Sequence, residues 1–357
     1  MFEVISPDHS GIAFSNNLLE NDTLNVMDFY YIYNGAGLGV GDFNNDGLKD
    51  VYFSGNQVSN QMYLNKGDLK FANVTAEANV AAEDIWGQGV ALVDINNDNW
   101  LDIYVCASIY GIAADRKNKL FINQGLNENG IPVFSEEAEK WGIQDTGHSA
   151  NAVFFDYDLD GDLDLFVLSN MMDRKFPSKF RTKSLDGSSV NADKLYRNQG
   201  DQSFVDVSME AGILVEGYSH GISIRDINLD GWQDIYITND YLTNDLMYIN
   251  QKDGTFSNEI AMHIKHQTHS AMGHDVGDIN NDGWTDIFTL DMLPEDNQRL
   301  KQMHAGTNFN VYSQNEKYGY EPQHKRNMLQ LHNGMHENGN YLFSEIGFYT
   351  GPVATDW

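Results

Sequence analysis

The chain has 357 residues, with 22 Lys and Arg against 52 Asp and Glu, which gives a formal net charge of −30. Hydrophobic residues make up 41% of the sequence, enough for a large core, so wholesale disorder is excluded. The negative charge argues against nucleic-acid partners and against docking on an anionic membrane, because both need a basic surface. A single cysteine, Cys106, rules out an internal disulfide framework.

The N-terminal segment, residues 1–33, is predicted to be a strand and turn, with no signal peptide and no membrane-inserting segment. Its phrase FEVISPDHSGI matches FVDVSMEAGI at residues 204–213, which has the pattern of the last strand of a repeating unit. In a circular repeat fold such an orphan strand completes the final unit. We therefore expect residues 1–33 to close a ring.

Five units follow, at about residues 34–85, 86–147, 148–217, 218–269 and 270–356. Each carries a nine-residue motif with Asp at positions 1, 5 and 9, Asn or Asp at position 3, and usually Gly at position 6. The motifs are DFNNDGLKD at 42–50, DINNDNWLD at 94–102, DYDLDGDLD at 156–164, DINLDGWQD at 226–234 and DINNDGWTD at 278–286. A Gly-rich apolar run precedes each motif, and three further short strand patterns follow it. The third ends in Asn or His-Asn and the fourth opens with Phe.

Four short strands per unit with little helical periodicity are typical of a β-propeller blade. We therefore predict an all-β chain forming a single β-propeller domain over residues 1–357. It would hold five complete four-stranded blades of a seven-bladed ring and would be C-terminally incomplete.

The motif chemistry predicts calcium. Oxygen ligands at positions 1, 3, 5 and 9, with a backbone carbonyl at position 7, would wrap one hard cation, and up to five ions would bind. An EF-hand is excluded, because Phe53 stands where the first motif would need Glu and the flanks are strands. The second motif is the weakest, since Asn99 replaces Gly, and the third is the most acidic. A hairpin of Asx turns without metal is the alternative interpretation.

The predicted side-chain ligands are Asp42, Asn44, Asp46 and Asp50; Asp94, Asn96, Asp98 and Asp102; Asp156, Asp158, Asp160 and Asp164; Asp226, Asn228, Asp230 and Asp234; and Asp278, Asn280, Asp282 and Asp286. The predicted carbonyl ligands are those of Leu48, Trp100, Asp162, Trp232 and Trp284.

These loops, each after a Gly-rich apolar strand, resemble the FG-GAP/VCBS repeats of integrin-α-type β-propellers. The segment DMLPEDNQRLKQ at 291–302 and the repeated F-x-x-x-S/T-x-x-x-G-I phrase resemble bacterial surface proteins that pair such repeats with a C-terminal ASPIC/UnbV domain. That domain has no counterpart here, so the resemblance implies a C-terminal truncation. It also implies seven blades, calcium loops on one face and ligand contacts on the opposite face. It specifies fold and metal, but no biochemical activity.

Three long connections, residues 107–119, 170–194 and 291–327, are expected opposite the calcium loops. The second holds a basic cluster that either balances neighbouring carboxylates or docks an anionic glycan or acidic partner; its members are Arg174, Lys175, Lys179, Arg181 and Lys183. The third holds Tyr312, Tyr318 and Tyr320, which either stack on sugars, cover a neighbouring subunit or are buried against the propeller.

Residues eight places before each motif are expected around a channel mouth on that same face: Asn34, Trp86, His148, Tyr218 and Ser270, with Trp357 next in register and His220, His269 and His274 nearby. From these, the candidate ligand-binding residues are Trp86, His148, Tyr218, His220 and His269. The alternative is that the aromatic rings plug the channel and the histidines are core residues.

The leading hypothesis is an extracellular, calcium-binding interaction module for a protein or glycan at the bacterial cell surface. It would be outer-membrane-associated or periplasmic, within a surface assembly. No catalytic residue is predicted, because nucleotide loops, Gly-x-Ser-x-Gly and His-Glu-x-x-His are missing from the sequence. One alternative is a polysaccharide lyase or hydrolase that uses His148, Tyr218, His220 and His269 at the channel mouth. Another is a scaffold for a C-terminal part.

Overall fold

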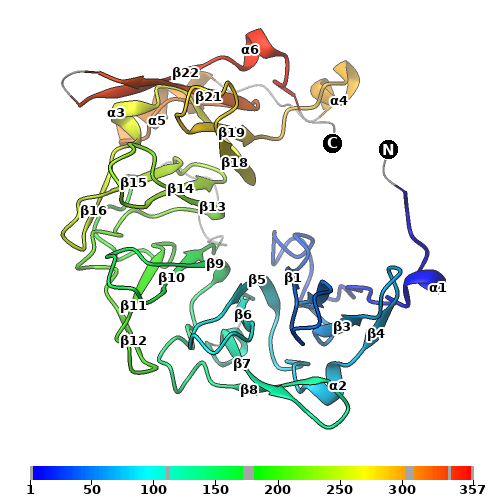
Figure 1. Ribbon diagram of the computed structural model, residues 1–357. Coiled ribbons are helices and arrows are strands. Elements are labelled where there is room, and N and C mark those ends of the chain that lie inside the picture. Colours follow the sequence, from blue (N-terminus) through cyan, green and yellow to red (C-terminus); the bar gives the residue numbers. More distant parts are fainter. Residues whose placement is uncertain (1–2, 110–112, 172–180, 303–308, 337–338, 355–357) are drawn as a thin grey trace. The chain divides into compact units, whose positions relative to one another are not determined.

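The computed structural model describes residues 3–109, 113–171, 181–302, 309–336 and 339–354. The chain divides into two compact units. The first comprises Met1–Phe154, Leu163–Val167 and Tyr196–Val205, and the second comprises Phe155–Asp162, Leu168–Leu195 and Asp206–Trp357. Both are built mainly from short β-strands (Figure 1).

Five four-stranded sheets take their strands in chain order. The first contains β1 (Leu38–Gly41), β2 (Asp50–Phe53), β3 (Gln61–Asn65) and β4 (Phe71–Asn73), and the second contains β5 (Gly87–Val93), β6 (Asp102–Ala107), β7 (Lys119–Leu126) and β8 (Pro132–Glu136). The third contains β9 (Ser149–Phe155), β10 (Asp164–Ser169), β11 (Lys194–Asn198) and β12 (Phe204–Asp206). The fourth contains β13 (Ser219–Arg225), β14 (Asp234–Asn239), β15 (Leu246–Asn250) and β16 (Phe256–Asn258), and the fifth contains β18 (Gly273–Gly277), β19 (Asp286–Leu290), β21 (Met328–Met335) and β22 (Tyr341–Glu345).

The strand pairing confirms the predicted all-β fold with four strands per repeat. In the first, second, fourth and fifth sheets every neighbouring pair is antiparallel. Each motif joins the first strand of its sheet to the second, as the sequence predicted. The total number of blades and the closure of a ring stay predictions.

Short helices and one small sheet complete the chain. Four single-turn helices are α1 (Pro7–Ser10), α2 (Thr75–Ala78), α3 (Ile260–His263) and α6 (Gly347–Thr350). The long connections carry η1 (Ala113–Arg116), α4 (Asn297–Gln302), α5 (Phe309–Asn315) and η2 (Glu316–Tyr318). The two-residue strands β17 (Gln267–Thr268) and β20 (Gln323–His324) pair in parallel.

The N-terminal strand was predicted wrongly. Among the described residues no strand precedes β1, and residues 3–6 are irregular before α1 begins. A strand is defined by its ladder with a neighbour, which the apolar pattern of residues 2–5 cannot supply by itself. The helical turn of the repeat is nevertheless present, because α1 ends in a left-handed Gly11 as α2 ends in a left-handed Asn79.

The left-handed residues Gly11, Asn79 and Gly212 each lie against the fourth strand of the following sheet. A Cβ on Gly11 would lie 2.6 Å from the carbonyl oxygen of Phe71, and one on Gly212 would lie 2.8 Å from that of Phe256. The Asn79 amide instead donates a hydrogen bond of 3.2 Å to the carbonyl of Phe134. The N-terminal segment therefore occupies the place of a preceding repeat's outer turn, although it forms no strand.

Apolar side chains fill the space between neighbouring sheets within each unit. In the first unit, a Cβ added to Gly39 of β1 would lie 3.0 Å from Leu92 and 3.1 Å from Val90 of β5, so the glycine makes room for those side chains. Cys106 is fully buried in the apolar cluster between the second sheet and neighbouring strands, and burial raises the pKa of its thiol. The prediction that Cys106 is a small buried hydrophobe is confirmed.

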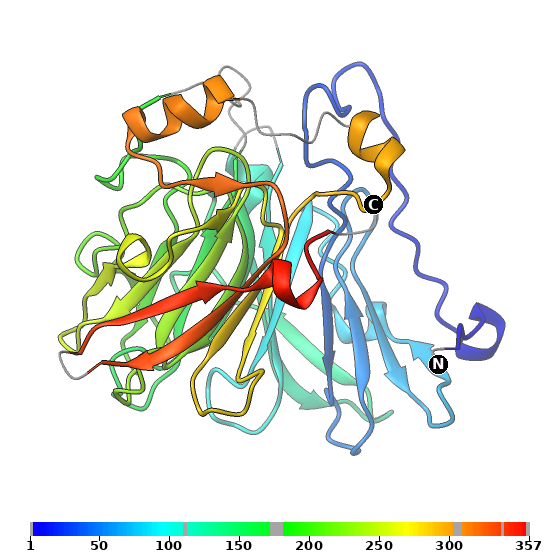
Figure 2. The ribbon, with the colours of Figure 1, turned by 90° about the horizontal axis from the view of Figure 1, so that it is seen from above.

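The fifth sheet differs from the others where its third strand ends. The β21–β22 hairpin, red in Figure 2, places His332 rather than Asn333 at the position of Asn65, Asn123, Asn198 and Asn250. The ring of His332 stacks on Trp284, with centroids 4.6 Å apart, and on Tyr341, with centroids 5.0 Å apart. Its Nδ1 accepts the Gly334 N–H at 2.9 Å, as the side-chain oxygen of the asparagine does elsewhere.

Candidate metal-binding loops

The five motifs fold into loops with the same backbone hydrogen bonds. The position 1 carboxylate accepts the N–H groups of positions 5 and 6; in the first loop Asp42 accepts from Asp46 at 3.1 Å and from Gly47 at 2.8 Å. The same pair of bonds forms at Asp94, Asp156, Asp226 and Asp278. The loop thus directs its N–H groups at its own carboxylates.

Two residues of each loop adopt the left-handed conformation. Position 6 has φ between 68° at Asn99 and 97° at Gly161, which agrees with the predicted preference for glycine. Position 4 also has positive φ, and at Leu159 and Leu229 this falls on a side chain that disfavours it. The sequence pattern did not predict strain at position 4. Non-glycine residues held in this conformation cluster at functional sites.

Positions 3 and 5 meet within the loop. In four loops the position 3 asparagine donates its amide to the position 5 aspartate, at 3.0 Å for Asn44 and 2.9 Å for Asn96, Asn228 and Asn280. The position 5 carboxylate also accepts the N–H of position 7, whose residues are Leu48, Trp100, Asp162, Trp232 and Trp284. In the third loop Asp158 replaces the asparagine and has no amide to donate.

The third loop concentrates carboxylates most strongly. Ligand oxygens of Asp156, Asp158 and Asp164 all lie within 4.8 Å of one another. Three carboxylates at this separation repel one another unless a cation or protons neutralise them.

The position 9 aspartate is fully buried in every loop, whereas the other predicted ligand residues, at positions 1, 3, 5 and 7, are half-buried or exposed. Asp234 accepts the N–H of Ile227 at 2.9 Å on one oxygen and the N–H of Asn250 at 2.9 Å on the other. The same pair of hydrogen bonds forms at Asp50, Asp102 and Asp286. Burial, reinforced by the neighbouring loop carboxylates, raises the pKa of Asp102 and Asp234 to about 7.

The donor set fits a hard cation. All the predicted ligand groups are carboxylate, amide or carbonyl oxygens, which calcium accepts in six- to eight-fold flexible coordination. The carboxylates of positions 1, 5 and 9 and the backbone carbonyl of position 7 would hold the ion, together with the amide oxygen of the position 3 asparagine or, in the third loop, the Asp158 carboxylate.

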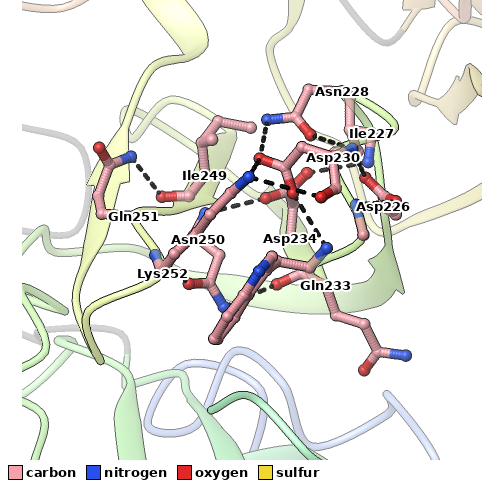
Figure 3. A network of polar contacts seen from close by, with 12 residues as sticks. Asp226, Ile227, Asn228, Asp230, Gln233, Asp234, Ile249, Asn250, Gln251 and Lys252 are labelled. Atoms are coloured by element: carbon pink, nitrogen blue, oxygen red, sulfur yellow. Dashed lines mark hydrogen bonds and ion pairs between the residues drawn. The ribbon is translucent and has the colours of Figure 1, made fainter. Parts of the chain in front are cut away.

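Figure 3 shows the fourth loop and the strand end beside it. Asp230 accepts from Asn228 and Trp232, and the ammonium of Lys252 lies 3.2 Å from its carboxylate. The amide of Asn250 donates to the carbonyls of Tyr157, at 2.8 Å, and Gln233, at 3.3 Å. The third strand's asparagine therefore fastens this loop to a residue of the preceding motif.

The candidate ligand-binding residues of the first unit are buried. Trp86 is 4% exposed and packs edge-on against Phe29, with centroids 5.8 Å apart. His148 lies 3.4 Å from the Ser108 hydroxyl, and burial, together with Arg116, lowers its pKa to about 4.

Those of the second unit are also largely enclosed. Tyr218 is 2% exposed and packs edge-on against Tyr241. Burial lowers the pKa of His220 and His269 to about 4, so both rings are neutral at pH 7. Contact of any of these residues with a ligand stays a prediction.

Part of the predicted basic cluster is committed to internal contacts. Arg181 pairs with Glu216, which is 1% exposed, and Lys183 donates to the Asn244 side chain at 3.5 Å. Burial lowers the pKa of Lys183. Arg174, Lys175 and Lys179 lie outside the described residues. Of the three tyrosines in 291–327, Tyr320 is buried as predicted, whereas Tyr312 is 41% exposed.

One repeated polar position was missed from the sequence. The residue just before the third strand caps the far end of the second strand by accepting a backbone N–H; it is Asn60, Asn118, Asp193, Asp245 or Asn327. All five are at most 3% exposed. The signal was available, because each stands five residues before the asparagine or histidine that ends that strand.

Four of the five loops lie within two matches to a known repeat. The FG-GAP-like repeat family matches residues 42–105, which contain the first and second motifs, and residues 226–289, which contain the fourth and fifth. Together with the repeated four-stranded sheets, these matches fit a propeller of FG-GAP type.

Two individual proteins are also similar. Cartilage acidic protein 1 of Xenopus tropicalis is 28% identical over 209 residues, which cover 57% of this chain and 28% of the relative. The chain thus spans less than a third of that relative's length. The crystal structure of the V. cholerae biofilm matrix protein Bap1 aligns with a TM-score of 0.38 and 12% identity, over 86% of this chain and 38% of that one. Among the described residues, no helix has the length and apolar character needed to cross a bilayer.

Proposed function

We propose that the five loops bind calcium and that the protein is an extracellular interaction module stabilised by these ions. The observation that carries the proposal is the repetition of one oxygen-rich loop geometry, with three or more acidic or amide side chains around a strained turn. The oxygen-only donor set favours calcium over transition metals, which prefer nitrogen or sulfur ligands. The FG-GAP-like matches support the same chemistry.

The extracellular setting follows from the chemistry of weak calcium sites. Loops of modest affinity fill where free calcium is in the millimolar range, as it is outside cells. The name of the curated relative, which refers to cartilage, points in the same direction. A bacterial cell surface remains our proposed location.

The interaction surface would lie at the ends of the strands opposite the calcium loops. The motif enters the second strand at one end, and residues 107–119, 170–194 and 291–327 leave it at the other. Long connections on a rigid scaffold commonly carry binding function. The partner would be a protein or a glycan.

Chelation tests the metal part. Removing calcium with EDTA should lower the thermal unfolding midpoint, because an ion at 100 times its Kd stabilises the native state by about 2.7 kcal/mol per site. Calcium should restore the midpoint and equimolar magnesium should restore less, since magnesium dehydrates reluctantly. Asp160→Asn should reduce the calcium-dependent shift, whereas Asp201→Asn, in the exposed β11–β12 turn, should leave it unchanged. An EDTA-insensitive midpoint would refute the calcium assignment.

Binding to glycan and protein arrays tests the interaction part. Replacing residues 172–180 by a short Gly-Ser linker keeps the contacts of Arg181, Lys183 and Asp193 and should weaken binding. The matched control shortens the β7–β8 turn at residues 127–130, which lies at the other strand ends. Unchanged binding after the first replacement would exclude that connection as the docking site.

A further inference from the structure

Lys252 stands where the other sheets have glycine. Two residues after the asparagine or histidine that ends the third strand, the chain has Gly67, Gly125, Gly200 and Gly334, all with φ between 73° and 83°. Lys252 adopts the same left-handed conformation with φ 65°. In all five sheets the N–H of the residue at this position donates to the side chain of the Asn or His two residues before it; in the fourth sheet Lys252 donates to Asn250 at 2.9 Å. A glycine would meet this backbone requirement at lower cost, so the lysine side chain needs another explanation.

The lysine side chain reaches the fourth loop. Its ammonium lies 3.2 Å from the Asp230 carboxylate and 3.5 Å from the Asp230 carbonyl oxygen (Figure 3). Asp230 is the position 5 residue, whose carboxylate also accepts from Asn228 and Trp232. The ammonium therefore neutralises a group that is proposed to hold the ion.

The equivalent place beside the other loops is empty of charge. Glycine at positions 67, 125, 200 and 334 provides no side chain. In the first, second and fifth loops, all of whose residues are described, no lysine or arginine ammonium or guanidinium pairs with a loop aspartate. Among the described residues, one tethered cation thus distinguishes the fourth loop from the first, second and fifth.

We propose that Lys252 is a built-in competitor for the fourth calcium site, which makes this loop weaker than the first and fifth. This inference depends on the proposed calcium binding. An incoming ion must break the Lys252–Asp230 pair and then reside near a retained positive charge, so the lysine opposes binding both before and after the ion arrives. The fourth site fills after the first and fifth as calcium rises and empties before them as it falls.

The surroundings allow the lysine to leave. Its side chain is 45% exposed, and it lines a groove of about 1190 Å³ between the fourth loop and the β21–β22 hairpin. Asn228, Asp230, Glu259 and His263 line the same groove. The displaced ammonium can turn into this solvent-filled space without moving the backbone, which the Asn250 bond holds.

Selective 15N-glycine labelling provides a separate reporter for most loops. Gly47, Gly231 and Gly283 occupy position 6 of the first, fourth and fifth loops, and each donates its N–H to the position 1 aspartate. The amide shift of each glycine is followed as calcium is added to the full chain. Gly231 should show the highest midpoint of the three.

Three variants separate charge from backbone strain. Lys252→Met keeps the stem and the left-handed backbone but removes the charge, Lys252→Gly also removes the strain, and Lys252→Arg keeps the charge. Both neutral variants should lower the Gly231 midpoint by about two- to fivefold, the range expected for one partly exposed ion pair, with Gly283 unmoved. Lys252→Arg should leave the midpoint high. Lys140→Met removes an exposed lysine that pairs with Glu137, outside every loop, and controls for net charge.

The outcomes are distinct. A Gly231 midpoint that does not change in Lys252→Met refutes the competitor role while leaving calcium binding intact. An equal shift at Gly231 and Gly283, or the same shift in Lys140→Met, refutes it in favour of a general charge effect. If no loop glycine responds to calcium, the proposed function itself fails and this inference with it.

Discussion

The two ends of the second strand in each sheet are closed by side chains with the same hydrogen-bonding task and different charge. At the start, the position 9 residue is Asp in all five sheets, and in the first, second, fourth and fifth it accepts N–H groups from both the loop and the third strand. At the end, the cap accepts one backbone N–H and is Asn in three sheets and Asp in two.

This difference between the two strand ends shows where a carboxylate is needed for hydrogen bonding and where its negative charge has a further role. The caps show that a neutral amide closes a strand end as well as a carboxylate does. At position 9 of the first, second, fourth and fifth loops both carboxylate oxygens accept N–H groups, a task that an amide with one oxygen cannot perform. A buried carboxylate is costly when it stands alone, and a bound cation would compensate it. The loop end therefore has two reasons to retain its charge, and the cap end has none.

The caps also exchange the direction of their hydrogen bonds. In the second sheet the Asn118 amide donates to the hydroxyls of Tyr104 and Ser149, each at 2.9 Å. The Tyr236 hydroxyl donates to Asp245, the cap of the fourth sheet, at 3.0 Å. The Ser219 hydroxyl donates to Asp193, the cap of the third sheet, at the same distance. Because hydroxyl groups both donate and accept, hydroxyl neighbours can form hydrogen bonds with either an amide cap or a carboxylate cap.

The largest expected effect comes from changing the loop end. Asp234→Asn should destabilise the protein by about 3 kcal/mol, because one buried N–H of Ile227 or Asn250 loses its acceptor. Part of the calcium-dependent stabilisation should disappear as well. Chemical denaturation with and without calcium measures both. Asp253→Asn, an exposed turn residue with the same change in charge, should have little effect; if Asp234→Asn behaves the same way, position 9 is no more than another cap.

A smaller loss is expected when a neutral cap is charged. Asn118→Asp should destabilise the protein by about 2 kcal/mol at pH 7.5, since the site is fully buried and a carboxylate there would lose its hydration. The loss should shrink at pH 4.5, where the carboxyl group binds a proton and can donate to Tyr104 or Ser149. Denaturation at the two pH values measures the difference. A pH-independent loss would show that packing, not charge, distinguishes the caps.

The fold was predictable because its signals are local and repeated. Five copies of the motif, each with a Phe-opening fourth strand, fixed the order and number of strands per sheet. The prediction of an N-terminal strand was wrong because an apolar pattern forms a strand only where a partner strand is available to pair with it. His332 was misaligned in favour of Asn333, since an imidazole nitrogen can replace an amide oxygen as an acceptor, which residue identity does not reveal.

The candidate sites were predictable only in part. The spacing of the aspartates identified the loops, but it could not show that position 9 is buried whereas positions 1 and 5 are not. It also could not reveal Lys252, because this residue belongs to a different turn and reaches Asp230 only through the fold. The residues assigned to a channel mouth had no local pattern beyond register, and most of them are enclosed by neighbouring side chains.

The smallest of these effects, and the only favourable one, is expected at the charged caps. Burial raises the pKa of Asp245 to about 7 from its ordinary value near 4, despite hydrogen bonds from Asn239, Tyr236 and Thr268 that favour the charged form. The folded state therefore binds the proton more tightly than the unfolded chain, so this group's contribution to stability is complete below pH 4 and is lost as the pH rises to about 7. Asp245→Asn should remove that loss and stabilise the protein by about 1 kcal/mol at pH 7.5, with little change at pH 4.5. Thermal unfolding between pH 4 and 8 measures the effect, and Asn327→Gln provides a control at a cap that does not titrate. If Asp245→Asn destabilises the protein at pH 7.5, the carboxylate is required at this end of the strand too, and the contrast between the two ends fails.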